Sequence, residues 1–292
     1  GSFTTAVFTS AGANTAIGIQ LFCLGTTLRV RDMGGVVKRG GVLLISKFVI
    51  GAAIGIVVGK VFGPTGVLGL SSLAIISAVT NSNGSIYLAL MNSYGDTVDQ
   101  AAMPLLAIND GPMLTMIAMG AGGLADIPLM ALVAAIGPIL VGMILGNIDK
   151  DLSDFLAPAG SILLPFVGFC LGSGMNLTNI AKGGVQGILL GLITCLIGGA
   201  FIMLCDKFIS RRPGYAGWAV ATTAGNAVAV PAVIAAADAT WAPWADIATS
   251  QVAASAILTA ILVPIITSWW AKKYGCPKFP KDEAQAALFA KD

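Results

Sequence analysis

The chain has no histidine, few charged residues and no cysteines in CxxC spacing. The absence of histidine excludes His-based catalysis, histidine metal sites and histidine proton relays. The five cysteines are odd in number, so they imply no disulfide framework. Four of them lie in apolar segments, where cysteine usually acts as a small buried hydrophobe.

Charge is scarce throughout the sequence. Charged residues make up 10% of the 292 residues, against about 25% in soluble domains. Hydrophobic residues make up 56%, and the mean hydropathy is +0.88. The predicted fold class is therefore an all-α polytopic membrane protein, with the lipid bilayer as a partner. The net charge of +2 gives no indication of nucleic-acid binding.

Length and hydropathy predict nine membrane-spanning helices. They cover residues 5–28, 40–61, 66–94, 100–120, 127–148, 155–175, 184–204, 215–236 and 247–270. The spans 66–94 and 215–236 each contain a polar, glycine-bearing stretch near the middle, which predicts two broken helices that cross each other. Breaks survive in membranes where they line a watery cavity, and they form the binding sites of secondary transporters. A polar loop between two short helices is the alternative.

Basic residues gather on one side of this predicted bundle. The other side holds only Lys60 and Lys182, while Lys47 lies within a span. The positive-inside rule places the basic side in the cytoplasm, with a cytoplasmic C-terminus. The residues on the basic side are Arg29, Arg31, Lys38, Arg39, Lys150, Lys207, Arg211, Arg212, Lys272, Lys273, Lys278, Lys281 and Lys291.

Three short motifs recur in the same order, about 145 residues apart, which indicates an internal repeat. FCLG at 22–25 recurs at 169–172, RGG at 39–41 matches KGG at 182–184, and the break at 81–84 matches 222–226. The offset crosses an odd number of spans, so the two halves are predicted to have inverted topology.

The repeat divides the chain into a first half at 1–126, a second half at 127–273 and a cytoplasmic tail at 274–292. The second half holds five spans and the first half four. We therefore expect one further N-terminal helix in the natural protein, which makes ten spans.

The two breaks predict the substrate site. Half-helices that begin at the midplane aim their N–H groups at one cavity, which favours an anionic ligand. The carbonyl ends of the departing halves suit a cation. Lys47 has three alternatives: contact with substrate, pairing with Asp110, or snorkelling to the cytoplasmic surface. The predicted substrate-binding residues are Asn81, Ser82, Asn83, Gly84, Thr222, Thr223, Gly225, Asn226 and Lys47.

Asp110 is the predicted coupling residue. It lies in the middle of a span, where a carboxylate is costly unless it is paired or protonated, and this suits a proton carrier. A structural Asp capping the turn before Pro112 is the alternative. Asn109, Thr80, Gln251 and Thr249 complete the predicted ion-coupling set. The coupling ion is a proton or sodium, and no other cofactor or metal is expected.

Several runs resemble the 2-keto-3-deoxygluconate permease family. They are TNSNGSIYLALMNSYG at 80–95, GPMLTM at 111–116, LGNID at 145–149 and ILVPIITS at 261–268. The resemblance covers nearly the whole chain. It implies a proton-driven symporter for 2-keto-3-deoxygluconate in the bacterial inner membrane. It also implies the bile acid/sodium symporter-like fold, with ten helices in two inverted repeats, a core domain and a panel domain.

The function predicted from these observations is secondary active transport of a small anionic sugar acid. A sodium-coupled or uncoupled organic-anion permease is the first alternative. An intramembrane enzyme is a further alternative, against which stands the lack of histidine, metal spacing and any nucleophile–base pair. A channel is another, and the sequence also leaves a homodimer open.

Overall fold

A computed structural model describes residues 9–28, 33–163, 165–166, 169–170 and 177–289. Within these residues the regular structure is helical, as predicted, apart from two isolated β-bridges, Val67 to Leu70 and Cys276 to Phe279. The second copy of the FCLG motif lies partly outside the described residues, because Leu171 and Gly172 are not among them. The same holds for the end of the predicted span 155–175.

The described residues form a series of helices. They are α2 (Ser10–Thr26), α3 (Met33–Phe62), α4 (Ser72–Thr80), α5 (Gly84–Tyr94), α6 (Thr97–Ala101), α7 (Met103–Leu106), η2 (Ala107–Asn109), α8 (Pro112–Ala121), α9 (Leu129–Ile148), α10 (Lys150–Leu156), α11 (Ala159–Ile162), α13 (Leu177–Leu192), the π-helical η3 (Ile193–Gly198), α14 (Gly199–Phe208), α15 (Tyr215–Ala219), η4 (Asn226–Ala229), α16 (Val230–Ala237), η5 (Ala239–Trp241), α17 (Ala242–Tyr274) and α18 (Glu283–Phe289).

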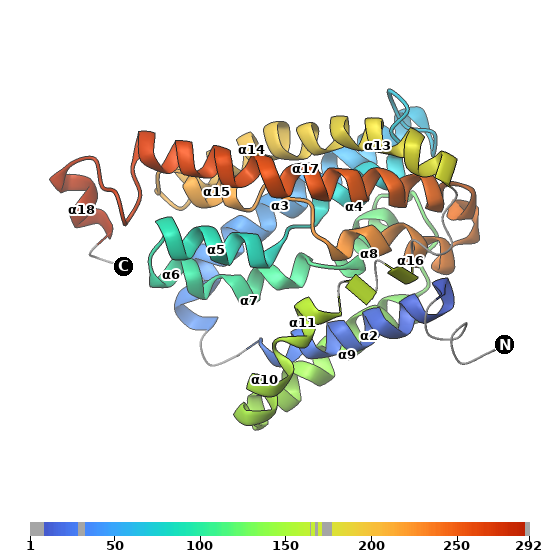
Figure 1. Ribbon diagram of the computed structural model, residues 1–292, viewed down its shortest axis with the longest axis horizontal. Coiled ribbons are helices and arrows are strands. Elements are labelled where there is room, and N and C mark those ends of the chain that lie inside the picture. The colour runs from blue at the N-terminus through green and yellow to red at the C-terminus, as the bar shows by residue number, and fades with distance from the viewer. Residues whose placement is uncertain (1–8, 29–32, 164, 167–168, 171–176, 290–292) are drawn as a thin grey trace.

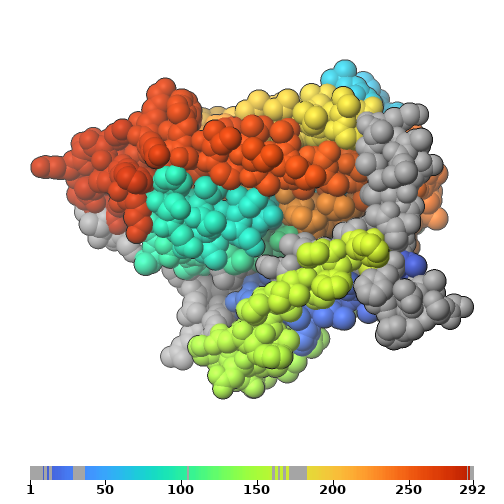
Figure 2. Space-filling view, in the orientation of Figure 1, coloured from blue at the N-terminus to red at the C-terminus, as the bar shows by residue number. Residues whose placement is uncertain are grey.

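Two layers of roughly aligned helices make up the molecule (Figure 1). The small layer consists of α2, α9, α10 and α11, and the main layer holds the remaining helices. Figure 2 shows the surface hollowed between the α5 segment of the main layer and α10–α11 of the small layer. A cavity lies between these layers.

Glycines hold α2 and α9 of the small layer at backbone distance. A Cβ at Gly25 would meet the Ile139 carbonyl oxygen at 2.3 Å, and one at Gly142 would meet the Phe22 oxygen at 2.1 Å. Side chains cannot be accommodated at such contacts, and small residues at helix interfaces are what membrane packing favours. The two helices therefore form one unit.

Five segments of the described residues are long and apolar enough to cross a membrane: Val37–Phe62, Ser72–Tyr94, Leu129–Ile148, Gly183–Phe208 and Ala239–Tyr274. Their outer faces expose large apolar side chains at helical spacing, as Ile257, Ile261 and Ile265 do on α17. An apolar exterior of this kind is typical of helices that face lipid.

The two predicted broken helices are confirmed. The first is α4 followed by α5, with residues 81–83 unwound between them. The second is α15 followed by η4 and α16, with residues 220–225 non-helical. Every residue of α4 is buried, so the break lies inside protein, where its backbone groups find partners.

The two broken helices run in opposite directions along α17. The first begins beside the start of α17, where the Ser71 N–H donates to Gln251 Oε1 at 3.1 Å. It ends beside the far end of α17, where the Tyr94 hydroxyl donates to Ser268 Oγ at 2.8 Å. The second begins at that far end, where Trp270 Nε1 donates to the Pro213 oxygen at 2.8 Å, and leads through η5 into the start of α17.

The span 100–120 was predicted without a break, and this is corrected: α6, α7, η2 and α8 take the place of a single helix. Gly111 has φ +151°, and Pro112 follows as the first residue of α8. A positive φ and a residue without an N–H both interrupt the helical hydrogen-bond ladder. The chain therefore contains a third break, at Asp110–Gly111.

Candidate functional site

The first break is stabilised by its own polar side chains. Thr80 Oγ1 donates to the Ile76 oxygen at 2.6 Å, and Asn81 Nδ2 donates to the Ser77 oxygen at 2.8 Å. These bonds satisfy carbonyls that the interrupted helix leaves open. Asn83 caps the new helix, because its Oδ1 accepts from the Ile86 N–H at 3.0 Å.

The second break is held by hydroxyl groups of α17. The Thr223 N–H donates to Thr259 Oγ1 at 2.9 Å, and the Thr223 and Ser255 hydroxyls lie 2.8 Å apart. The Asn83 N–H donates to Thr222 Oγ1 at 2.7 Å, which joins the two breaks directly. The opposed helices therefore meet at their unwound residues.

The third break joins the same network. The Gly111 N–H donates to Asn81 Oδ1 at 2.8 Å, and Ser82 Oγ donates to Asn109 Oδ1 at 2.7 Å. These bonds fix the loop that carries Asp110. The alternative role for Asp110, capping the turn before Pro112, is not what holds this loop: the anchors are Asn81 and Ser82, in the first break.

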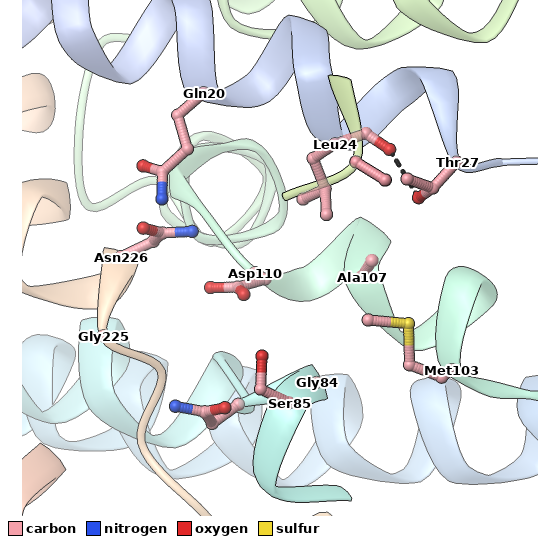
Figure 3. Close-up of a pocket in the computed structure, with 12 residues that line it drawn as sticks. Gln20, Leu24, Thr27, Gly84, Ser85, Met103, Ala107, Asp110, Gly225 and Asn226 are labelled. Atoms are coloured by element: carbon pink, nitrogen blue, oxygen red, sulfur yellow. Dashed lines mark hydrogen bonds between the residues drawn. The ribbon is translucent and has the colours of Figure 1, made fainter. Parts of the chain in front are cut away.

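A cavity of ≈ 200 Å³ lies where the three breaks meet, against α2 of the small layer. Figure 3 shows the Asp110 carboxyl pointing into it, with Asn226 and Gln20 on one side and Ser85 below. The lining residues are Gln20, Leu24, Thr27, Asn83, Gly84, Ser85, Met103, Ala107, Asp110, Ala157, Gly225 and Asn226. Among the predicted residues, Asn83, Gly84, Asp110, Gly225 and Asn226 therefore come together.

Two polar atoms of the cavity region are buried and lack a hydrogen-bond partner among the described residues: Asp110 Oδ1 and Asn226 Oδ1. The Asn226 side chain hydrogen-bonds the Asp110 carboxyl. An ionised carboxylate with an unsatisfied oxygen is costly away from bulk water, whereas a protonated one is much less so. This arrangement suits a carboxyl group that exchanges a proton with the cavity or donates to a bound ligand.

Most of the other predicted residues are buried near the breaks and do not line the cavity. Thr80, Asn81, Ser82, Asn109, Thr222 and Thr223 are buried in the hydrogen bonds of the breaks. Lys47 is fully buried and donates from Nζ to the Thr222 oxygen at 2.8 Å, so the snorkelling alternative is wrong. None of these residues lines the cavity.

Gln251 and Thr249 lie away from the cavity. Gln251 is hydrogen-bonded to Gly69 and Ser71 just before α4 and to Gln186 on α13. Thr249 is two residues before it on α17. The nine residues of α4 separate this point from the first break by about 13 Å. The structure brings neither residue to Asp110, and Ser255 and Thr259 hold the positions on α17 beside the second break.

The sequence prediction did not include the part of the cavity contributed by the small layer. It also missed the residues contributed by α7 and η2 and, beyond Gly84, by α5. Gln20, Leu24 and Thr27 come from α2, Ser85 from α5, and Met103 and Ala107 from α7 and η2. Gln20 offered a signal, because it is polar in the middle of an apolar span. The apolar lining residues offered none, because only the packing of the two layers brings them to the cavity.

A second buried polar cluster, also missing from the prediction, ties four segments together. Arg39 on α3 contacts Asp99 on α6, with Nε and Oδ1 2.7 Å apart, and pairs with Asp206 on α14. The Tyr215 hydroxyl donates to Asp99 Oδ2 at 2.6 Å. Burial raises the pKa of the Asp99 carboxyl, but the charges of Arg39 and Arg212 outweigh burial and leave its pKa below the ordinary value.

Breaks that meet inside an apolar helical bundle, with a carboxyl group in the cavity between them, define a membrane transport protein. No group of three His, Cys, Asp or Glu side chains in the described part of the chain is placed to hold a metal. The chain belongs to the 2-keto-3-deoxygluconate permease family, whose pattern it matches over residues 1–276. This family consists of permeases, so the protein is a transporter and not an enzyme.

Individual relatives agree with this assignment. A 2-keto-3-deoxygluconate permease 1 from Salmonella typhimurium is 47% identical over 273 residues, which cover 94% of this chain and 86% of the relative. A 2-keto-3-deoxygluconate permease from Bacillus subtilis is 38% identical over 278 residues, covering 94% and 84%. One from Enterobacter sp. is 38% identical over 290 residues, covering 98% and 86%.

Proposed function

We propose that this protein is a proton-coupled symporter that takes up 2-keto-3-deoxygluconate, or a similar sugar acid, across the bacterial inner membrane. The names of the relatives support the substrate. The observation that carries the coupling is the Asp110 carboxyl, which faces the cavity between the breaks with one oxygen unpartnered among the described residues.

The substrate carboxylate binds at the start of α5 and the Asn226 side chain. Gly84 and Ser85 open α5 and line the cavity, so the positive end of an 11-residue helix faces the ligand. The helix that begins after the second break differs, because its first turn is the 3₁₀ helix η4. The N–H groups of Ala227 and Val228 donate to the Ala224 and Gly225 oxygens and so do not face the ligand. On that side the amide of Asn226 takes the place of backbone N–H groups.

Charge couples the proton to the substrate. Two carboxylates in one small cavity repel each other, so an anionic sugar acid binds well only when Asp110 is protonated. The protonated carboxyl also gains a donor, which the substrate can accept. When the substrate leaves, ionised Asp110 keeps its bond from Asn226. Proton and substrate therefore bind together and leave together.

The cavity reaches from the breaks toward one end of the molecule. It extends along α2 from Gln20 to Thr27 and takes in Ala157, at the end of α10. This is the end that carries the C-terminus and the basic residues Lys207, Arg211, Lys272 and Lys273, called here the basic end (Figure 1). By the positive-inside rule it is cytoplasmic, and the conformation is inward-facing.

Inverted repeats at 1–126 and 127–273 account for the opposed directions of the broken helices. Matching hydrogen bonds support the same relation. The Thr80 and Thr115 hydroxyls lie 2.8 Å apart at the first break, and the Thr223 and Ser255 hydroxyls lie 2.8 Å apart at the second. A site between inverted repeats is suited to alternating access, in which the two layers move relative to each other around the substrate.

Uptake into proteoliposomes tests this function. Purified protein is given a panel of labelled sugar acids with an imposed proton gradient, a sodium gradient or neither. We expect 2-keto-3-deoxygluconate to accumulate only with the proton gradient, and unlabelled substrate inside to drive counterflow without any gradient. Accumulation driven by sodium alone would instead support the sodium-coupled alternative, and flux without counterflow would indicate a channel.

A further inference from the structure

Lys47 is a buried lysine at the crossing of the broken helices. It lies on α3, its side chain has 0% exposure, and its Nζ donates to the Thr222 backbone oxygen at 2.8 Å. Among the described residues no carboxylate lies within ion-pair distance of it, and its titratable neighbour is the Cys195 thiol of η3. A buried charge without an ionic partner is rare unless it serves a site.

The packing of α3 directs Lys47 to this place. Gly51, one turn further along α3, approaches the first break so closely that a Cβ would lie 2.6 Å from the Thr80 nitrogen. Lys47 therefore enters between the two breaks from the α3 side. Its Nζ donates to the backbone oxygen of Thr222. The hydroxyl of the same Thr222 accepts the hydrogen bond from the Asn83 N–H.

The two breaks differ in what satisfies their carbonyls. At the first, neutral groups of Thr80 and Asn81 donate to the Ile76 and Ser77 oxygens. At the second, the Lys47 amine, the group that can carry a charge, donates to the Thr222 oxygen. Unwound carbonyls at the departing end of a half-helix are groups that hold a coupling Na⁺ in secondary transporters.

We propose that the Lys47 ammonium is a tethered cation that occupies the cation position of the second break in place of Na⁺. The inference rests on the proposed symport and explains why a proton, and not sodium, accompanies the substrate. With ionised Asp110 the empty site holds one positive and one negative charge. With protonated Asp110 and a substrate anion it again holds one of each, so neither state buries a net charge.

Sodium binding by purified variants tests this without any transport step. Lys47→Ala removes the ammonium and leaves space beside the Thr222 oxygen, whereas Lys47→Met removes the charge and keeps the side chain's bulk. Lys60→Ala, at the exposed end of the same helix, is the matched control. Thermal unfolding is followed in NaCl and in choline chloride, with binding of radiolabelled Na⁺ measured in parallel.

We expect wild type, Lys60→Ala and Lys47→Met to bind no Na⁺ and to unfold at the same temperature in both salts. Lys47→Ala should unfold earlier in choline and gain roughly 5 °C or more in saturating Na⁺, with saturable Na⁺ binding. Na⁺ binding by the wild type would overturn the proposal. So would a Lys47→Ala protein that ignores Na⁺ or cannot be recovered in either salt.

These outcomes are separate from a failure of the proposed symport. Proton coupling through Asp110 is judged by uptake, whereas the tethered cation is judged by binding and unfolding in the absence of substrate. Gradient-independent uptake by wild type combined with Na⁺ binding only in Lys47→Ala would reject the first and keep the second.

Discussion

Asn81, Asn83 and Asn226 are the same residue type in three environments at the breaks. Asn81 uses both ends of its amide inside the protein, on the Ser77 oxygen and the Gly111 N–H. Asn83 caps α5 and lines the cavity. Asn226 faces the cavity with an oxygen that has no partner among the described residues. Binding and stability should therefore respond differently at the three positions.

Asn226→Ala should weaken substrate binding by about 1–3 kcal/mol, because the ligand carboxylate and the Asp110 carboxyl lose a donor. The unfolding temperature should fall only modestly, because Asn226 gives one side-chain hydrogen bond, to the Asp110 carboxyl, and leaves its own oxygen unpaired. Binding is measured by calorimetry with 2-keto-3-deoxygluconate. Asn92→Ala, at an exposed asparagine of α5, is the control and should bind like wild type. Unchanged affinity in Asn226→Ala would remove this residue from the site.

Single residues show what could be predicted from the sequence. Asp110 and the asparagines of the breaks could be recognised because a polar side chain within a membrane-length apolar run is costly and usually functional. Arg39 and Asp206 were not recognised as partners, because 167 residues separate them and only the packing of α3 on α14 brings them together. Lys47 was recognised, but its bond to the Thr222 backbone depends on the path of the second break.

At the scale of elements, the close approach of α3 to α4 positions the first break. Gly51→Ala would place a Cβ 2.6 Å from the Thr80 nitrogen and 2.7 Å from the Val79 carbonyl carbon, so backbone would have to shift. We expect a loss of about 1–3 kcal/mol in stability and a displaced break. Thermal unfolding and uptake measure the two effects.

Gly41→Ala is the matched control, because it lies on the same helix and its Cβ would have no atom within 4 Å. It should be neutral or slightly stabilising, since alanine favours helix over glycine by up to about 1 kcal/mol. Equal behaviour of the two variants would contradict the close packing of α3 on α4.

The buried ionic cluster of Arg39, Asp99, Asp206 and Arg212 joins α3, α6, α14 and the loop before α15 near the basic end. Asp99→Asn should cost about 3–5 kcal/mol, because it leaves buried arginine charge under-compensated. The folded pKa of Asp99 is lowered, so its stabilising effect is complete above the ordinary aspartate pKa of about 3.9. That effect is lost as the pH falls toward the folded pKa.

Unfolding temperatures measured from neutral to acid pH check this sign. The wild type should lose stability in acid more steeply than Asp99→Asn, which has no carboxyl to protonate there. Asp282→Asn, at an exposed position before α18, is the control, and its unfolding temperature should depend on pH as that of wild type does. If the unfolding temperatures of wild type and Asp99→Asn fell equally steeply with decreasing pH, Arg39 and Arg212 would not lower the pKa of Asp99 as assigned.

Elements also differ in how far the sequence reveals them. The breaks in α4–α5 and α15–α16 follow from polar and glycine residues inside apolar runs, and both were predicted. The break at Asp110–Gly111 was missed, although Gly111-Pro112 is a signal for one, because the flanking residues are apolar enough to form a span. The bonds from Asn81 and Ser82 that hold it come from a distant segment.

At the scale of the whole molecule, the cavity lies between two layers and extends toward the basic end. A cysteine at Thr27, which lines the cavity, should react with a membrane-impermeant maleimide from the cytoplasmic side. One at Thr65, exposed between α3 and α4, should react from the opposite side. The background carries Cys205→Ser, because the other native cysteines are buried.

Intact cells and inverted membrane vesicles provide the two sides for labelling. Substrate should slow the reaction at position 27 several-fold and leave position 65 unchanged. Labelling of both positions from the same side would contradict the transmembrane arrangement. Labelling of position 27 only from outside would reverse the proposed orientation.

The central claim is that Asp110 carries the coupling proton. It is tested most directly by comparing gradient-driven accumulation with counterflow in proteoliposomes that contain Asp110→Asn. The variant keeps the shape of the side chain and cannot release a proton, and exchange of substrate does not require that release. We predict that Asp110→Asn fails to concentrate labelled 2-keto-3-deoxygluconate under a proton gradient, while counterflow continues at a rate close to that of wild type. Gradient-driven accumulation by Asp110→Asn would contradict the account and place the coupling elsewhere in the protein.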